Sequence, residues 1–316
     1  MTDLIKPSDK LVLFGGAGLV GQNLIVLLKE QGYTRLVVID KHHANLDILR
    51  KLHPEIEAIE ADMAVAGEWQ NAAQGAAAAV MLQAQIGGEF VAEFTANNVT
   101  ATELALEAMR RHGVPYFVHI SSSVVNSMAR DFYTESKKAQ EKIVVAQGIA
   151  HCVLRPTLMF GWFDRKHLGW LSRFMQTMPV FPVPGSGRYM RQPLYVRDFC
   201  NIIVSCLKRR TSGIHDITGA EKIDYIDIIR EIKRVTKAKA LIVKIPYSLF
   251  WLLLKTYALF SRNPPFTTQQ LKALITPDEF VVIPWWEIFA VQATPFAAAV
   301  QQTYGPSPYQ ETVLEF

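Results

Sequence analysis

Cysteine is scarce in this sequence, and its scarcity excludes two classes of protein. Cys152, Cys200 and Cys206 form no CxxC pair, so the chain lacks the spacing of a zinc site or a dithiol redox motif. A chain of 316 residues can bury a large core, unlike the small secreted scaffolds that depend on disulfides. We therefore expect a cytoplasmic protein that holds no metal.

A large excess of charge of either sign is also missing. The 33 Lys and Arg residues and the 29 Asp and Glu residues leave a net charge of +4, which is too small to indicate a nucleic-acid partner. The one dense basic run, Lys208 to Arg210, falls where a helix is expected to end, and cations there stabilise the helix dipole. With 50% hydrophobic and 20% charged residues, the composition excludes a disordered chain.

No apolar run is long enough to span a bilayer, so we expect no transmembrane segment. The first ten residues carry no apolar stretch of the kind that signal peptides have. The most apolar segment, residues 248–260, is too short to cross a membrane and contains Lys255. We interpret it as a buried helix in preference to a helix that lies in a membrane interface.

Apolar runs with strand character alternate with helical patterns through the first half of the chain. Strands are expected at residues 11–14, 35–39, 79–82, 115–120 and 150–154, and helices at 20–31, 97–112 and 133–146. This alternation predicts an α/β fold with a Rossmann-type, doubly wound parallel sheet. Residues 1–157 are expected to bind a dinucleotide. Residues 158–316 are expected to form a smaller, mainly substrate-binding part, with some elements returning to the sheet.

A glycine-rich turn follows the first expected strand. Gly15, Gly18 and Gly21 occupy a GxxGxxG spacing that opens a helix, where backbone N–H groups can meet a pyrophosphate. Asp40 ends the second expected strand, where a carboxylate accepts hydrogen bonds from the adenosine ribose and would repel a 2′-phosphate. The turn therefore predicts NAD as cofactor, and the adjacent Lys41 leaves NADP open.

A tyrosine and a lysine stand four residues apart on the expected helix at 133–146. Tyr133 and Lys137 therefore share one helix face. A nearby cation lowers the pKa of a phenol, so Tyr133 could take a proton from a substrate hydroxyl while hydride leaves the same carbon. Three serines, Ser121 to Ser123, follow an expected strand, at the edge of the sheet where ligands bind in this fold class.

Together these motifs, over residues 10–219, resemble the extended short-chain dehydrogenase/reductase family in its NAD-dependent epimerase/dehydratase branch. Motif alignment indicates Ser123 as the acting serine, and its position only ten residues before Tyr133 leaves Ser122 possible. The resemblance implies the following cofactor-binding set: Gly15, Gly18, Leu19, Val20, Gly21, Asp40, Lys41, Asp62, Met63, Leu82, Gln83, Ala84, Ser121, Tyr133, Lys137 and Pro156. Gln83 departs from the family pattern, which has Ala there.

The segment from Pro184 to Asp198 also resembles a family motif, and this motif bears on the substrate. Arg191 matches the arginine that binds the substrate diphosphate in nucleotide-sugar enzymes, a role that suits the planar guanidinium. The resemblance thus implies an NAD(P)-dependent epimerase or oxidoreductase that acts on a nucleoside-diphosphate sugar. Arg191, Ser123 and Tyr133 would bind this substrate, and the enzyme would be a homodimer.

Two other functions remain open from the sequence. The apolar segment at 248–260 and the aromatic tail with Trp285, Trp286 and Phe289 suit a reductase of an apolar ketone, near the 3β-hydroxysteroid dehydrogenases. A non-catalytic dinucleotide-binding scaffold or sensor is the other alternative. The intact pair of Tyr133 and Lys137 argues against it.

Overall fold

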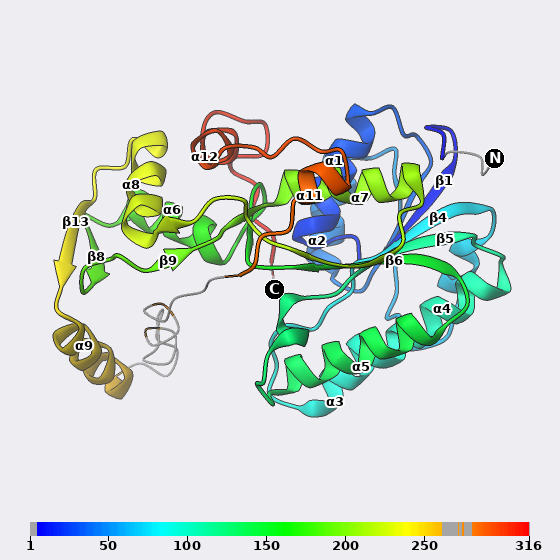
Figure 1. Ribbon diagram of the computed structural model, residues 1–316, viewed down its shortest axis with the longest axis horizontal. Helices are drawn as coiled ribbons and strands as arrows, with labels where there is room; N and C mark the ends of the chain where they lie inside the picture. Colours follow the sequence, from blue (N-terminus) through cyan, green and yellow to red (C-terminus); the bar gives the residue numbers. More distant parts are fainter. Residues whose placement is uncertain (1–4, 261–270, 272–273, 275–279, 316) are drawn as a thin grey trace.

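A seven-stranded parallel sheet forms the centre of the molecule (Figure 1). The computed structural model describes residues 5–260, 271, 274 and 280–315. The strands lie in the order β11-β6-β5-β4-β1-β2-β3. Their bounds are β1 (Lys10–Phe14), β2 (Leu36–Asp40), β3 (Glu57–Glu60), β4 (Ala76–Met81), β5 (Tyr116–Ile120), β6 (Ala150–Pro156) and β11 (Gly213–Ile217). The predicted Rossmann-type fold is therefore confirmed.

Helices cover both faces of the sheet, which is why its central strands are apolar along their whole length. On β1, Leu11 and Leu13 pack into one hydrophobic cluster, and Val12 and Phe14 pack into the other. The first face is covered by α1 (Leu19–Glu30) and α7 (Val196–Arg209), with α2 (His43–Leu52) beside them. The second is covered by α4 (Ala101–Arg111), α5 (Phe132–Ala146) and the short helix η1 (Glu68–Ala73).

The helix expected at residues 97–112 begins earlier than its sequence pattern indicated. It starts with α3 (Val91–Phe94), continues through the π-helical segment η2 (Thr95–Thr100) and ends in α4 at Arg111. The residues of α3 are mostly exposed, so the apolar periodicity that marks a packed helix is absent there. The basic run ends α7 as expected, with Arg210 as its C-cap.

The C-terminal part packs three two-stranded sheets and several helices around a separate apolar cluster. Its elements are β7 (Met159–Phe160), α6 (His167–Thr177), β8 (Val180–Pro184), β9 (Met190–Arg191), β10 (Leu194–Tyr195), β12 (Ile223–Asp224), α8 (Tyr225–Thr236), β13 (Leu241–Ile245), α9 (Tyr247–Phe260), α11 (Trp285–Ile288) and α12 (Phe296–Tyr304). The chain also returns to the central sheet from this half, because α7 and β11 belong to the Rossmann core.

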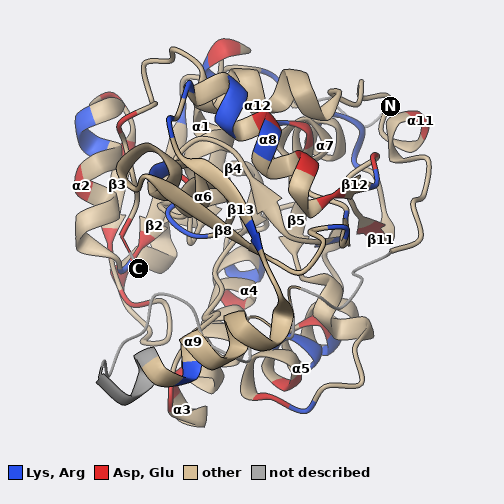
Figure 2. Ribbon diagram, turned by 90° about the vertical axis from the view of Figure 1, so that its left-hand side faces the viewer, with Lys and Arg blue, Asp and Glu red and all other residues tan. Residues whose placement is uncertain are grey.

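The apolar helix α9 lies at the end of the molecule opposite β1, β4 and β5, below β8 and β13 (Figures 1 and 2). The expectation that it is buried is wrong for its outward face, because Leu249, Leu252 and Leu253 are 47–52% exposed. The sequence could not show this, because the helix carries apolar side chains on all its sides and has no polar face that would mark the exposed side. Within the described residues, no helix is long and apolar enough to cross a bilayer.

Candidate cofactor and catalytic site

The carboxyl ends of five neighbouring parallel strands bring the predicted cofactor and catalytic residues to one edge of the sheet. The glycine turn follows β1, Asp40 ends β2, and Leu82 to Ala84 follow β4. The three serines follow β5, and Pro156 ends β6. In open α/β sheets this edge is where ligands bind. The substrate-motif residue Arg191 lies on β9, outside the central sheet.

Two glycines of the turn are required by close backbone approaches. Gly15 has φ +72°, and a Cβ there would lie 2.5 Å from the Cα of Gln83. A Cβ at Gly21 would lie 2.1 Å from the carbonyl oxygen of Gly16. Gly18 differs, because it precedes α1 as the N-cap residue and a Cβ there would enter open space. The turn thus leaves room for a ligand in front of the N–H groups that begin α1.

Asp40 binds the glycine turn as well as facing the expected ribose position. The N–H of Ala17 donates to one of its carboxylate oxygens (2.9 Å), and the N–H of His42 donates to the other (3.0 Å). These bonds fix the carboxylate beside the turn. Each oxygen keeps a lone pair that can accept from a ribose hydroxyl.

Lys41 connects two segments that flank the expected adenine position. Its ammonium donates to the side-chain oxygen of Asn97 (2.6 Å) and lies 3.6 Å from the carboxylate of Asp62. Both ion-pair partners are about half exposed, so this bridge contributes little to stability. Met63 is buried behind it.

A chain of buried side chains links the glycine turn to Lys137. The Gln83 amide and the Gln140 amide both donate to the hydroxyl oxygen of Thr102, at 3.1 and 2.8 Å. The Lys137 ammonium in turn donates to the side-chain oxygen of Gln140 (2.5 Å) and to the carbonyl of Ile120 (3.1 Å). Sequence reasoning missed Gln140 and Thr102, although Gln83 signalled the network by replacing the usual Ala.

Lys137 is completely buried, and burial lowers its pKa to about 7, with the carboxylate of Glu141 opposing the shift. His119 on β5 is also fully buried, and burial lowers its pKa well below the usual value, with Lys137 adding to the shift. Neither ring nitrogen of His119 has a hydrogen-bond partner among the described residues. The interior around Lys137 therefore disfavours a second positive charge.

The side chain of Ser122 lies near Tyr133 and acts on its pKa, whereas Ser123 begins the short helix η3 (Ser123–Asn126). Burial raises the pKa of Tyr133, Ser122 lowers it, and Asp131 raises it. The net shift of the Tyr133 pKa is upward in this structure, and Lys137 is not among its causes. The physical reason is that the Lys137 ammonium binds Ile120 and Gln140.

Ser121 belongs to a different network from its neighbours. Its hydroxyl donates to the carboxylate of Glu141 (2.5 Å), which also forms a two-pronged ion pair with Arg155. Although burial raises the pKa of Glu141, the bonds from Arg155 and Ser121 hold it below its ordinary value. Ser121 therefore joins β5, α5 and β6. Asp131 also supports α5, because its carboxylate accepts from the N–H of Thr134 (2.9 Å) as the N-cap.

Arg191 lies half-buried on β9, which pairs with β12. Its guanidinium donates to the carbonyl of Met190 (2.9 Å) and to that of Leu274. It also approaches Tyr225, whose pKa is raised by burial and lowered in part by Arg191. A substrate diphosphate would therefore replace backbone carbonyls as its partner.

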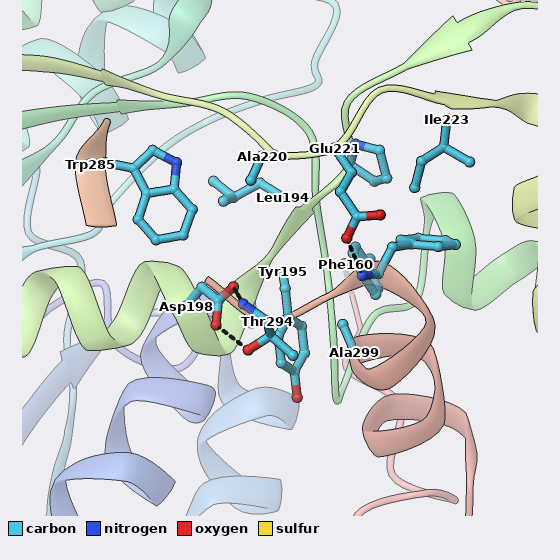
Figure 3. A pocket seen from close by; sticks show the side chains of 13 residues that line it. Phe160, Leu194, Tyr195, Asp198, Ala220, Glu221, Ile223, Trp285, Thr294 and Ala299 are labelled. Atoms are coloured by element: carbon cyan, nitrogen blue, oxygen red, sulfur yellow. Dashed lines mark hydrogen bonds between the residues drawn. The ribbon is translucent and has the colours of Figure 1, made fainter. Parts of the chain in front are cut away.

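The small cavity in Figure 3 is a structural joint rather than a ligand site. Its volume is about 20 Å³, which is room for one water. Asp198 on α7 accepts from the N–H and hydroxyl of Thr294, and Glu221 accepts from the N–H of Phe296 at the start of α12 (Figure 3).

A larger hollow of about 700 Å³ lies along α7 and residues 289–295, and none of the predicted site residues lines it. No described group of His, Cys, Asp and Glu side chains is arranged to hold a metal ion.

Comparison with known proteins gives matches among sugar-nucleotide and steroid enzymes. The chain is 29% identical over 184 residues to a 3 beta-hydroxysteroid dehydrogenase/Delta 5-->4-isomerase of Mycobacterium tuberculosis, a match that covers 49% of this chain and 48% of that protein. It thus spans about half the length of that relative. It is 25% identical over 260 residues to a dTDP-glucose 4,6-dehydratase of Actinoplanes sp., covering 70% of this chain and 81% of that one.

Solved structures show the same fold. A UDP-N-acetylglucosamine 4-epimerase of Methanobrevibacter ruminantium, in complex with UDP-N-acetylmuramic acid, has a TM-score of 0.71 at 15% identity and covers 94% of this chain and 97% of that chain. A UDP-glucuronic acid 4-epimerase of Bacillus cereus, in complex with NAD, has a TM-score of 0.63 at 22% identity and covers 75% and 86%.

The family match covers nearly all of the expected dinucleotide-binding part, residues 1–157, and continues into the C-terminal half of the chain. Residues 11–218 match the family described as "NAD dependent epimerase/dehydratase family". This span begins in β1 and ends directly after β11, so it includes all seven strands of the central sheet apart from Lys10 at the start of β1. It confirms the family that the sequence motifs indicated and agrees with the expectation of an NAD-dependent enzyme. The chain belongs to the NAD-dependent epimerase/dehydratase family.

Proposed function

We propose that this chain is an NAD-dependent epimerase or oxidoreductase that acts on a nucleoside-diphosphate sugar, with Tyr133 as its acid and base. The observation that carries the proposal is the placement of Tyr133 near Ser122, whose side chain acts on the Tyr133 pKa, at the sheet edge that also carries the glycine turn and Asp40. The proposal therefore assigns proton transfer to a tyrosine and a serine at the same edge as a dinucleotide-type turn.

The residues present fit NAD. Gly18 opens onto free space at the start of α1, so a pyrophosphate can approach the backbone there. Asp40 offers carboxylate oxygens at the end of β2, where a 2′-phosphate would be repelled. Lys41 is the one nearby cation that would favour NADP, and it is bound to Asn97 and Asp62. Bound NAD would supply the acceptor and donor of hydride.

Tyr133 would take the proton of a sugar hydroxyl as hydride leaves the same carbon, and return it in the reverse step. Ser122 would support this step, because its side chain lowers the Tyr133 pKa against the effect of burial. Lys137 would contribute a fixed positive charge on the same helix face as Tyr133, because Gln140 and Ile120 hold its ammonium in place. We propose Ser122 as the acting serine.

Arg191 would bind the diphosphate of the substrate. Its guanidinium already bridges backbone carbonyls, so it is held in place and can exchange these acceptors for phosphate oxygens. The named sugar-nucleotide relatives support this substrate class. We also keep the proposal of a homodimer.

A second candidate function is reduction of an apolar, steroid-like ketone. It is favoured by exposed apolar side chains close to the start of α5: Phe90 and Val91 are 66% and 57% exposed, Met128 is 94% exposed, and Phe132 is 49% exposed. Phe132 precedes Tyr133 and its ring contacts Phe94 (5.9 Å between centroids). The match to a 3 beta-hydroxysteroid dehydrogenase/Delta 5-->4-isomerase supports this second candidate function.

Thermal-shift titration separates these candidates. NAD and NADP are tested first, followed by UDP-, GDP- and dTDP-sugars and a 3β-hydroxysteroid with the preferred dinucleotide present. A ligand at 100 times its dissociation constant stabilises the fold by about 2.7 kcal/mol, which is readily measured. Arg191→Ala should abolish the sugar-nucleotide shift, whereas Arg188→Ala, on an exposed neighbour in the same segment, should preserve it. A shift with the steroid alone would replace the first proposal by the second.

A further inference from the structure

The outward face of α9 carries apolar side chains. Leu249, Leu252 and Leu253 stand at i, i+3 and i+4, so they line one side of the helix, and each is about half exposed. Trp251 and Leu254 are less exposed. The ammonium of Lys255 lies over the Trp251 ring, 4.6 Å from its centroid. The helix therefore presents leucines to its surroundings with a lysine beside them.

A second apolar group lies at the same end of the molecule, on the strand pair β8–β13. Leu241 pairs with Val180, and parallel partners lie side by side on one face. These two side chains are 64% and 41% exposed, and Val243, two residues along β13, is 41% exposed. Both views place β13 and α9 together at this end (Figures 1 and 2).

The segment that carries these residues contains charged side chains of only one sign, and Glu231 of α8, just before it, pairs with Arg234. Residues 232–260 contain six Lys and Arg residues and no Asp or Glu. Six cations exceed the net charge of the whole chain, which is +4, so the rest of the chain is net negative. Lys237, Lys239 and Lys244 are exposed and form no ion pair with a described residue. On this face Figure 2 shows blue residues on β13 and α9, and both blue and red ones on α8.

We propose that α9 and the β8–β13 pair form a docking surface for an anionic lipid bilayer. Leucines would enter the boundary between headgroups and acyl chains, while the lysines contact anionic headgroups. A second copy of this chain fits the surface poorly, because it would bring cations against cations. The surface lies at the end of the molecule opposite β1 (Figure 1). This inference is independent of which substrate the enzyme uses.

Vesicle co-sedimentation of the full chain tests the proposal. Vesicles of equal parts phosphatidylglycerol and phosphatidylcholine are compared with vesicles of phosphatidylcholine alone. Binding should be at least about tenfold stronger to the anionic vesicles, since each lysine near such a surface contributes on the order of fivefold. Raising the salt from about 0.1 M to about 1 M shortens the screening length from roughly 10 to 3 Å and should release most of the protein.

Two double variants with matched controls locate the surface. Lys237→Glu/Lys239→Glu should lower anionic-vesicle binding at least about tenfold, while Lys51→Glu/Lys142→Glu, the same charge change on α2 and α5, should lower it much less. Leu249→Ser/Leu253→Ser should also reduce binding, and Ile214→Ser/Val281→Ser, at exposed apolar positions elsewhere, should not. NAD-induced thermal shifts confirm that each variant is folded.

Several results would overturn the proposal. Absence of binding to anionic vesicles would do so, as would equal binding to both kinds of vesicle. Equal losses in the matched control variants would show that total charge, and not this surface, is responsible. If the leucine variants instead abolish self-association measured by analytical ultracentrifugation, the surface is an interface between copies of this chain.

Discussion

The two halves of this molecule place their polar and charged residues in opposite ways. At the carboxyl edge of the sheet they are buried and bonded to one another, as in the chain from Lys137 through Gln140 to Thr102. In residues 232–260 the lysines are exposed and stand beside exposed leucines. Buried polar networks specify one geometry, which chemistry needs. Exposed groups of this kind suit a fluid or variable partner, and we propose that the two halves divide these tasks.

The largest expected effect tests whether the buried half carries the chemistry. Tyr133→Phe removes the phenol oxygen and should lower kcat/KM by about 10²- to 10⁴-fold, the usual contribution of a general acid or base. NAD binding by thermal shift should remain. Tyr247→Phe, at a partly exposed tyrosine on α9, is the matched control and should retain full activity. Retained turnover in Tyr133→Phe would show that Tyr133 is not the acid and base of the reaction.

Two glycine variants sharpen the distinction between packing and ligand binding within the turn. Gly21→Ala forces a Cβ to 2.1 Å from the Gly16 oxygen, so α1 must move, and we expect a loss of about 1–3 kcal/mol in the free energy of unfolding. Gly18→Ala meets open space and should leave the unfolding temperature unchanged while weakening NAD binding. Urea denaturation and NAD titration measure both. An equal loss of stability in the two variants would contradict the assigned roles.

The pH dependence of stability tests the buried Lys137. Its pKa is about 7 in the folded protein, below the ordinary value of 10.5, so between these pH values the unfolded chain binds one more proton than the folded one. The cost of burying Lys137 in its charged form is therefore fully present below pH 7. Between pH 7 and 10.5 the free energy of unfolding rises with pH, at about 1.4 kcal/mol per pH unit. Lys137→Met should lose this component, seen as a difference in urea denaturation at pH 6.5, 8 and 9.5 against the wild type. An identical pH slope in both proteins would show that Lys137 is not buried as a titrating group.

The smallest effect concerns how the C-terminal part is held to the sheet half. Asp198→Ala removes both hydrogen bonds to Thr294 and should cost about 1–3 kcal/mol, because a buried donor loses its partner. NAD affinity should be unchanged, since none of the predicted cofactor residues contacts this joint. Asp227→Ala, at an exposed carboxylate on α8, is the control and should cost little. A fall in NAD affinity in Asp198→Ala would show that the two halves are coupled.

Much of the fold and part of the site could be predicted from local sequence. The strand–turn–helix order around Gly15 and Asp40 sets the sheet edge, because short-range periodicity and glycine spacing are local properties. The helix that carries Tyr133 and Lys137 was expected at residues 133–146 and spans Phe132–Ala146. The early start of the preceding helix at Val91 was missed, since its exposed first turn has no apolar pattern.

The sequence by itself determined the family and the order of the elements, and it indicated which residues meet at one edge of the sheet. Only the tertiary structure decided their partners. Lys137 binds Gln140 and Ile120, and Ser122 rather than Ser123 acts on the pKa of Tyr133. Tertiary packing also left one side of α9 exposed, although its composition indicated burial. The physical reason is that hydrogen-bond partners and exposure depend on segments far apart in the chain, which local spacing cannot place.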